Sequence, residues 1–372
     1  MNMKIAFIAT MGSALEFYDY IIYGFFAHIL SSQFASFSQA NSVLSQIAFS
    51  SLIFAIGCVA RPIGAIIFGY IGDTQGRLKS LYYSMLLSGF SCILIVITPN
   101  YYAIGIFSTI IFFFTRICQS IAFSGSLSSS ITYFAEITTL KHRGLWISTI
   151  FMGVTRGLIL ASVIGSILLI FLTEPQLAQW GWRIAFLIGL PIILAAIYTK
   201  NILPESPLYI RSHKKHPFTQ PFKLITKDYK LDILFGLGLY SPLCISTTCF
   251  FFYLPIFLSH YKVSPLQIIT INTSGLLMFS VLIPLFAWLG DFIGQRKLLL
   301  TSCIFIIFTS QLCYDLLISK DLILMCAGSM ILGCITAMLM VTIPVIIAGQ
   351  FPTKIRLSGI ALTHNLSYAI IS

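Results

Sequence analysis

Charged side chains are scarce in this sequence. Asp, Glu, Lys and Arg together account for 9% of the 372 residues, against 58% for hydrophobic types, and the mean hydropathy is +0.94. Soluble domains carry roughly a quarter charged residues. Only the stretch near residues 208–230 is polar enough to face water on all sides. The composition therefore excludes an ordinary water-soluble protein and favours a lipid bilayer as the solvent for most of the surface.

Patterns for metal binding and catalysis are also missing from the sequence. The nine Cys residues all lie in apolar segments, with no C-x-x-C spacing and no His beside them in a ligand pattern. The sequence contains no nucleophile–base constellation and no phosphate-binding loop. We therefore expect buried, unreactive thiols, no metal, no cofactor and no enzymatic activity.

Long apolar runs dominate what is present. Each run of about 17 to 25 residues is long enough to cross the hydrocarbon core as a helix. Such runs must be helical, because lipid offers no partner for backbone groups and because they lack the short alternating pattern of barrel strands. The fold class predicted is an all-α membrane protein with ten spans and an incomplete eleventh. The runs lie near residues 4–30, 46–70, 81–98, 103–135, 145–172, 184–203, 232–259, 266–290, 298–316, 322–349 and 357–372.

Basic residues are unevenly divided between the two sides of this map. Of the 22 Lys and Arg residues, sixteen fall on the side of the N-terminus and the 204–231 loop, three on the other side and three inside spans. Because basic loops stay in the cytoplasm, the N-terminus and the 204–231 loop are predicted to be cytoplasmic and the membrane to be a bacterial inner membrane. The same rule explains the net charge of +11 without nucleic acid as a partner.

The spans are arranged as two similar halves. Six precede the basic loop and five follow it, which predicts an N-terminal bundle over 1–203, a cytoplasmic linker over 204–231 and an incomplete C-terminal bundle over 232–372. A turn of the form G-D-x-x-G followed by a basic residue occurs at matching places in both halves. We predict that the two turns form a conformational latch, and ordinary polar turns are the alternative. The residues of this latch are Gly69, Asp73, Gly76, Arg77, Asp291, Gly294 and Arg296.

The run from Gly69 to Lys79 resembles the signature loop of the major facilitator superfamily. Other stretches are similar to its metabolite:proton symporter branch, which includes proline/betaine, 2-oxoglutarate, citrate and shikimate carriers. The resemblance implies a secondary transporter that takes up a small polar metabolite, such as an organic acid, proline or betaine, together with protons. Its partners would be that solute, protons and membrane lipid, with the proton gradient as driving force. The stretches that carry it are Ala14–Tyr20, Arg61–Gly64, Arg116–Gln119, Ala135–Glu136, His142–Gly144, Trp180–Arg183, Pro204–Pro207 and Phe351–Gly359.

Charge inside a membrane span is costly and marks candidate sites. Glu16 and Asp19 are three residues apart on one face of the first helix, and two carboxylates so close in a low dielectric tend to share one proton. Arg116 can pair with them or with an anionic solute through its planar fork, and fixed ion pairs with Arg116 or Arg156 are the structural alternative. Arg61 adjoins Pro62 and Gly64, which favours a role in helix packing.

The sequence departs from the family pattern at three places. Ser126 stands where the resemblance implies a Glu, which raises the question of proton coupling, while the serines around it line a cavity or serve as small packing residues. Arg156 replaces a small or apolar family residue and is either a solute contact or a sign of decay. The sequence ends at Ser372, before the family's twelfth helix, so a non-transporting remnant, or one piece of a split transporter with a separately encoded C-terminal fragment as partner, is the alternative function.

Overall fold

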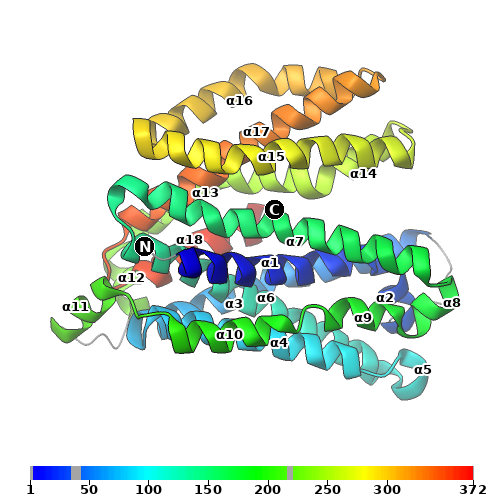
Figure 1. Cartoon of the computed structure of the whole chain (residues 1–372), viewed down its shortest axis with the longest axis horizontal. Helices are drawn as coiled ribbons and strands as arrows, with labels where there is room; N and C mark the ends of the chain where they lie inside the picture. Colours follow the sequence, from blue (N-terminus) through cyan, green and yellow to red (C-terminus); the bar gives the residue numbers. More distant parts are fainter. Residues whose placement is uncertain (1–2, 35–42, 216–220, 372) are drawn as a thin grey trace.

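The computed structural model describes residues 3–34, 43–215 and 221–371, and these ranges are almost entirely α-helical, with no strand among them (Figure 1). Nine helices of the described part are long and apolar enough to cross a membrane. Two more helices, α1 (Met3–Phe25) and α18 (Arg356–Ile371), lie within the same bundle. The prediction of an all-α membrane protein is confirmed, because long uniform apolar runs can satisfy their backbone groups only as helices.

Six long helical stretches lie in the described part of the first half, residues 3–34 and 43–203. The sixth is divided between α9 and α10, and π-helical residues Leu177–Gly181 precede α9. The remaining helices before residue 203 are α2 (Ala27–Phe34), α3 (Val43–Thr74), α4 (Arg77–Ile97), α5 (Tyr101–Ile104), α6 (Ile106–Ile137), α7 (Arg143–Phe171), α8 (Glu174–Gln176), α9 (Trp182–Leu187) and α10 (Pro191–Ile202).

The second half begins with two short helices that carry many of the basic residues. A π-helical segment, Cys249–Tyr253, joins α13 to α14. The helices are α11 (Pro207–Lys215), α12 (Pro221–Asp228), α13 (Lys230–Thr248), α14 (Leu254–His260), α15 (Pro265–Ile293), α16 (Gln295–Leu317) and α17 (Leu322–Gln350), followed by α18.

Small residues set the closest helix contacts. At Gly157 of α7 an added Cβ would lie 2.3 Å from the carbonyl oxygen of Ala14, and at Gly64 of α3 it would lie 2.4 Å from that of Ile121. Helices in lipid associate through such close packing, because burying apolar surface from lipid gives no hydrophobic gain. Glycine therefore brings α1 against α7 and α3 against α6.

Helices from the two halves of the chain meet along two main seams. In one, α18 packs on α3, and in the other, α15 packs on α7. Figure 1 shows α13, α15, α16 and α17 on one side of α7, with α1, α4 and α10 on the other. The seams enclose a space in the middle of the molecule.

Candidate functional site

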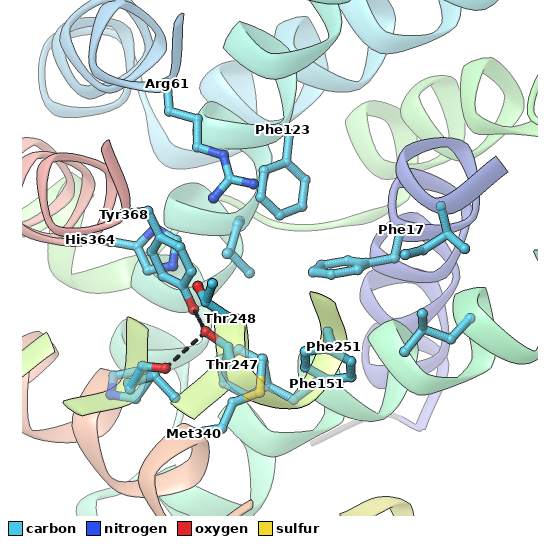
Figure 2. A pocket seen from close by; sticks show the side chains of 15 residues that line it. Phe17, Arg61, Phe123, Phe151, Thr247, Thr248, Phe251, Met340, His364 and Tyr368 are labelled. Atoms are coloured by element: carbon cyan, nitrogen blue, oxygen red, sulfur yellow. Dashed lines mark hydrogen bonds between the residues drawn. The ribbon is translucent and has the colours of Figure 1, made fainter. Parts of the chain in front are cut away.

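A central cavity with an empty volume of about 750 Å³ lies between helices of both halves (Figure 2). Most of its wall is apolar, and five aromatic side chains belong to it. Small-molecule sites have this character, with a few polar groups that fix orientation. The lining residues are Phe17, Ile21, Arg61, Phe123, Leu127, Phe151, Leu158, Leu243, Thr247, Thr248, Phe251, Met340, Pro344, His364 and Tyr368.

Arg61 of α3 supplies a cation to this cavity. Its side chain is only 6% exposed, and its guanidinium carbon lies 5.0 Å from the ring centroid of Phe123 and 5.2 Å from that of Tyr368. Such cation–π contacts help to hold a guanidinium in a fixed place. The neighbouring Pro62 favoured a packing role for Arg61 in the sequence, and that role stays a prediction. An arginine deep within an apolar span is costly to bury and therefore also marks a candidate site.

His364 and Tyr368 bring α18 into the cavity wall. The Tyr368 hydroxyl lies 3.0 Å from Thr247 Oγ1 on α13, as Figure 2 shows. The His364 ring lies 4.8 Å from the Tyr368 ring, and its Nδ1 atom is buried with no hydrogen-bond partner in the described structure. Sequence reasoning missed both residues, because a single His on an apolar helix has no distinctive spacing.

The two predicted carboxylates are buried against α6. Asp19 is 1% exposed, and its Oδ2 atom accepts a hydrogen bond from Gln119 Nε2 at 2.7 Å and another from the Cys92 thiol. Gln119 Oε1 in turn accepts from Arg116 Nη1 at 3.1 Å. The amide therefore links the predicted carboxylate of α1 to the predicted guanidinium of α6. Gln119 was absent from the predicted site because an intramembrane amide carries no charge to mark it.

Glu16 and Ser126 also lie together. Glu16 is 5% exposed, and Ser126 on α6 faces it closely enough to hydrogen-bond its carboxyl group. Arg156 lies elsewhere. It is exposed near the middle of α7, on the same face as Ile159 and Val163, and does not belong to the cavity lining. The structure thus brings Glu16, Asp19, Arg116 and Ser126 into one region and leaves Arg156 outside it.

The first predicted latch turn joins the two halves. Asp73 pairs with Arg77 at 3.1 Å and accepts hydrogen bonds from the backbone amides of Leu357 and Ser358 at 3.2 and 2.9 Å. These amides open α18, so the carboxylate caps a helix of the opposite half. Gly76 has a φ of 128°, which only glycine adopts easily.

Glu136 extends this cluster. Its carboxylate lies 2.9 Å from Arg77 and 3.1 Å from Arg356, one from each half. Tyr209 of α11 covers the Arg77 guanidinium at 4.8 Å and donates to the Thr74 carbonyl at 3.0 Å. Burial raises the pKa of Tyr209, which keeps its hydroxyl protonated as a donor.

The second latch turn repeats the arrangement from the other side. Asp291 accepts hydrogen bonds from the backbone amides of Gly144 and Leu145 at 2.8 and 2.9 Å, at the start of α7. Gly294 has a φ of 101°, and Arg296 is exposed. Gly69 of the first turn allows α3 and α18 to pack closely, since an added Cβ would lie 2.9 Å from the Ser358 Cα atom. Each aspartate therefore caps a helix that belongs to the other half.

Known protein families and individual relatives match this chain over most of its length. The family described as sugar (and other) transporter matches residues 5–220, and the family described as major facilitator superfamily matches residues 236–365. A putative proline/betaine transporter of Staphylococcus haemolyticus is 31% identical, over 99% of this chain and 78% of its own length. The proline/betaine transporter of Escherichia coli K12 is 27% identical, over 97% of this chain and 74% of its own length.

Solved structures show the same fold. A double-tryptophan mutant of XylE superimposes with a TM-score of 0.84 at 18% identity, covering 99% of this chain and 87% of that one. The human organic anion transporter MFSD10 gives a TM-score of 0.67 at 14% identity, and the match covers 98% of this chain and 92% of that one.

Proposed function

The chain belongs to the major facilitator superfamily and is a membrane transporter rather than an enzyme, and we propose that it carries a small zwitterionic or carboxylate metabolite, such as proline or betaine, together with protons. The proposed membrane is the bacterial inner membrane, with the basic 204–231 loop in the cytoplasm. Residues 1–203 and 232–372 would rock as two bundles about the central cavity.

The position of Arg61 supports this solute class most directly. A guanidinium binds a carboxylate through two parallel hydrogen bonds, while the faces of aromatic rings attract an ammonium group. The cavity offers Arg61 together with Phe17, Phe123, Phe151, Phe251 and Tyr368, and the lining residues that the structure describes include no carboxylate. A solute with one carboxylate and one substituted ammonium would satisfy both features.

Proton coupling is proposed for the carboxylates of α1. Burying an ionised carboxylate is costly, so binding a proton is the cheapest way to neutralise Glu16 or Asp19. The hydrogen bonds from Gln119 and Cys92 favour the ionised form of Asp19. Opposing influences of this kind keep a carboxyl group able to take up and release a proton during a cycle.

The test is uptake of labelled proline and glycine betaine into proteoliposomes, with and without an imposed proton gradient. Arg61→Gln should lower uptake about 30-fold, because a charge-assisted pair contributes about 2 kcal/mol. Arg61→Lys should retain part of it. Lys320→Gln, at an exposed loop, is the control. No uptake of either solute by the unmodified chain at matched membrane levels would contradict the proposal.

A further inference from the structure

Polar side chains make up a small part of the wall of the central cavity, and they come from three helices. They are Arg61 of α3, Thr247 and Thr248 of α13, and His364 and Tyr368 of α18. The other described residues of the lining are aliphatic, aromatic, Met or Pro. A solute in the cavity would therefore find its hydrogen-bonding partners among these few side chains.

Tyr368 holds Arg61 and His364 close to each other. The hydroxyl hydrogen of Thr247 goes to the Leu243 carbonyl at 2.8 Å, so Tyr368 is the donor in the 3.0 Å contact between the two hydroxyl groups. This bond fixes the Tyr368 ring. The Arg61 guanidinium carbon lies 5.2 Å from the centroid of that ring, and the His364 ring lies 4.8 Å from it. A guanidinium and an imidazole thus contact the same aromatic ring, in the region that Figure 2 shows.

His364 has hydrogen-bonding capacity that the protein leaves unused. Its side chain is 6% exposed and packs between the rings of Tyr368 and Tyr240, the latter at 5.2 Å. The Nδ1 atom has no hydrogen-bond partner among the described residues, and the amide of the adjacent Asn365 donates to the Ala361 carbonyl instead. Buried polar atoms are rarely left unpaired, because losing the bond to water is costly. An unpaired nitrogen on a residue of the cavity wall is therefore suited to a bond with a ligand.

The His364 imidazole is neutral in these surroundings. A second positive charge close to Arg61, away from water, would be repelled by the guanidinium. A neutral imidazole has one nitrogen that donates a hydrogen bond and one that accepts. An acceptor nitrogen can bind an ammonium group that carries N–H but not one that is fully methylated, whereas the faces of aromatic rings attract both kinds.

We propose that His364 makes the cavity selective for solutes whose ammonium group carries N–H, so that the chain prefers proline to a fully methylated zwitterion such as glycine betaine; the inference rests on the solute class proposed above. Arg61 binds the carboxylate, and the imidazole accepts a hydrogen bond from the ammonium group beside it. A site built to bond a solute N–H rejects an analogue without it, because the buried acceptor is then left unpaired.

Three compounds with the same ring test this selectivity. Proline has two N–H bonds, N-methylproline has one and N,N-dimethylproline has none. As competitors of labelled proline uptake into proteoliposomes, the first two should have inhibition constants within about threefold of each other, and the third should compete about tenfold more weakly, the effect of one charge-assisted hydrogen bond.

Two substitutions at His364 separate hydrogen bonding from size. His364→Leu keeps a similar volume and removes both nitrogens, so the three inhibition constants should come within about threefold of one another. His364→Asn carries an amide oxygen at about the distance of Nδ1 from the backbone and should retain the preference. His260→Leu is the matched control, since His260 is exposed at the end of α14 and does not line the cavity; it should leave the order unchanged.

The outcomes distinguish this inference from the proposed function. Equal competition by all three compounds in the unmodified chain overturns the inference by itself, while uptake of proline still supports the solute class. The same tenfold preference in His364→Leu overturns it too, because size alone then explains the order. Loss of the preference in Thr248→Val but not in His364→Leu would assign the acceptor to that hydroxyl. If the unmodified chain takes up no proline and binds none of the three compounds, the solute class fails, and the inference fails with it.

Discussion

Arg61 and Asp19 are both buried among membrane helices, and neutral groups are among the contacts of each. Arg61 lies over two aromatic rings, whereas Asp19 accepts hydrogen bonds from an amide and a thiol. Arg116 lies beyond Gln119 rather than in a direct ion pair with Asp19 that the structure describes, and neutral donors stabilise a carboxylate less than a bound cation does. The surroundings of Asp19 are thus compatible with titration during a cycle.

Gln119 should control this carboxylate. Gln119→Leu removes the donor to Asp19 and the acceptor for Arg116, and leaving such groups unpaired costs about 1–3 kcal/mol. We expect proton-driven uptake to fall about tenfold and its dependence on pH to shift. Uptake measured across a pH series is the readout.

Gln311→Leu provides the comparison, because Gln311 also donates to a carboxylate, Asp315 at 3.0 Å, but is exposed on α16. It should change neither quantity. If both variants keep the pH profile of the unmodified chain, Gln119 has no part in proton coupling.

For individual site residues, a charge inside a predicted span was a better guide than the spacing of residues in the sequence. Glu16, Asp19 and Arg116 were predicted as a site because ionised groups in a span require a reason, and the structure places them in one region. Arg156 met the same criterion but lies on an exposed face of α7. Gln119 is uncharged and His364 is isolated in the sequence, so their roles depend on which helices pack together, and no local pattern shows that.

The two latch turns are the elements that join the halves. Each aspartate accepts two backbone amides at the start of a helix across the seam, and the first also belongs to a network of four charged side chains. The repeat in the sequence predicted where these turns lie. It did not predict that each would cap a helix of the opposite half, because the partner helix lies more than 140 residues away.

Asp73→Asn should weaken this seam without unfolding the helices. The amide can still accept a hydrogen bond but loses the charge that attracts Arg77 and the start of α18. We expect uptake to fall more than membrane abundance, because the latch affects the conformational cycle. Both are measured in the same membranes by transport assay and quantitative immunoblot.

Asp291→Asn should act in the same direction, since it disturbs the equivalent cap on α7. Asp315→Asn, at an exposed position on α16, should leave uptake unchanged. Parallel losses of uptake and abundance in the two latch variants would mean that the turns serve folding alone.

For the whole molecule, hydropathy was sufficient to predict an all-α membrane fold. The predicted spans correspond to helices, because lipid permits little else for long apolar runs. The pairing of α3 with α18 and of α7 with α15 could not be predicted, since it depends on glycine contacts and caps between distant segments. The location of the central cavity follows from that pairing, so it could not be predicted from the sequence either.

The orientation of the whole chain in the membrane is predicted from the excess of basic residues on one side. Single cysteines test it. Lys227 on α12 and Lys262 after α14 lie on opposite sides of the predicted map, and both are exposed. With the nine native Cys residues replaced by serine or alanine, an impermeant maleimide should label Lys262→Cys in intact cells and Lys227→Cys only in permeabilised cells or inverted vesicles. We expect this result because moving the 204–231 loop outward would carry its many positive charges across the membrane. Labelling of Lys227→Cys in intact cells, with Lys262→Cys protected, would reverse the predicted topology.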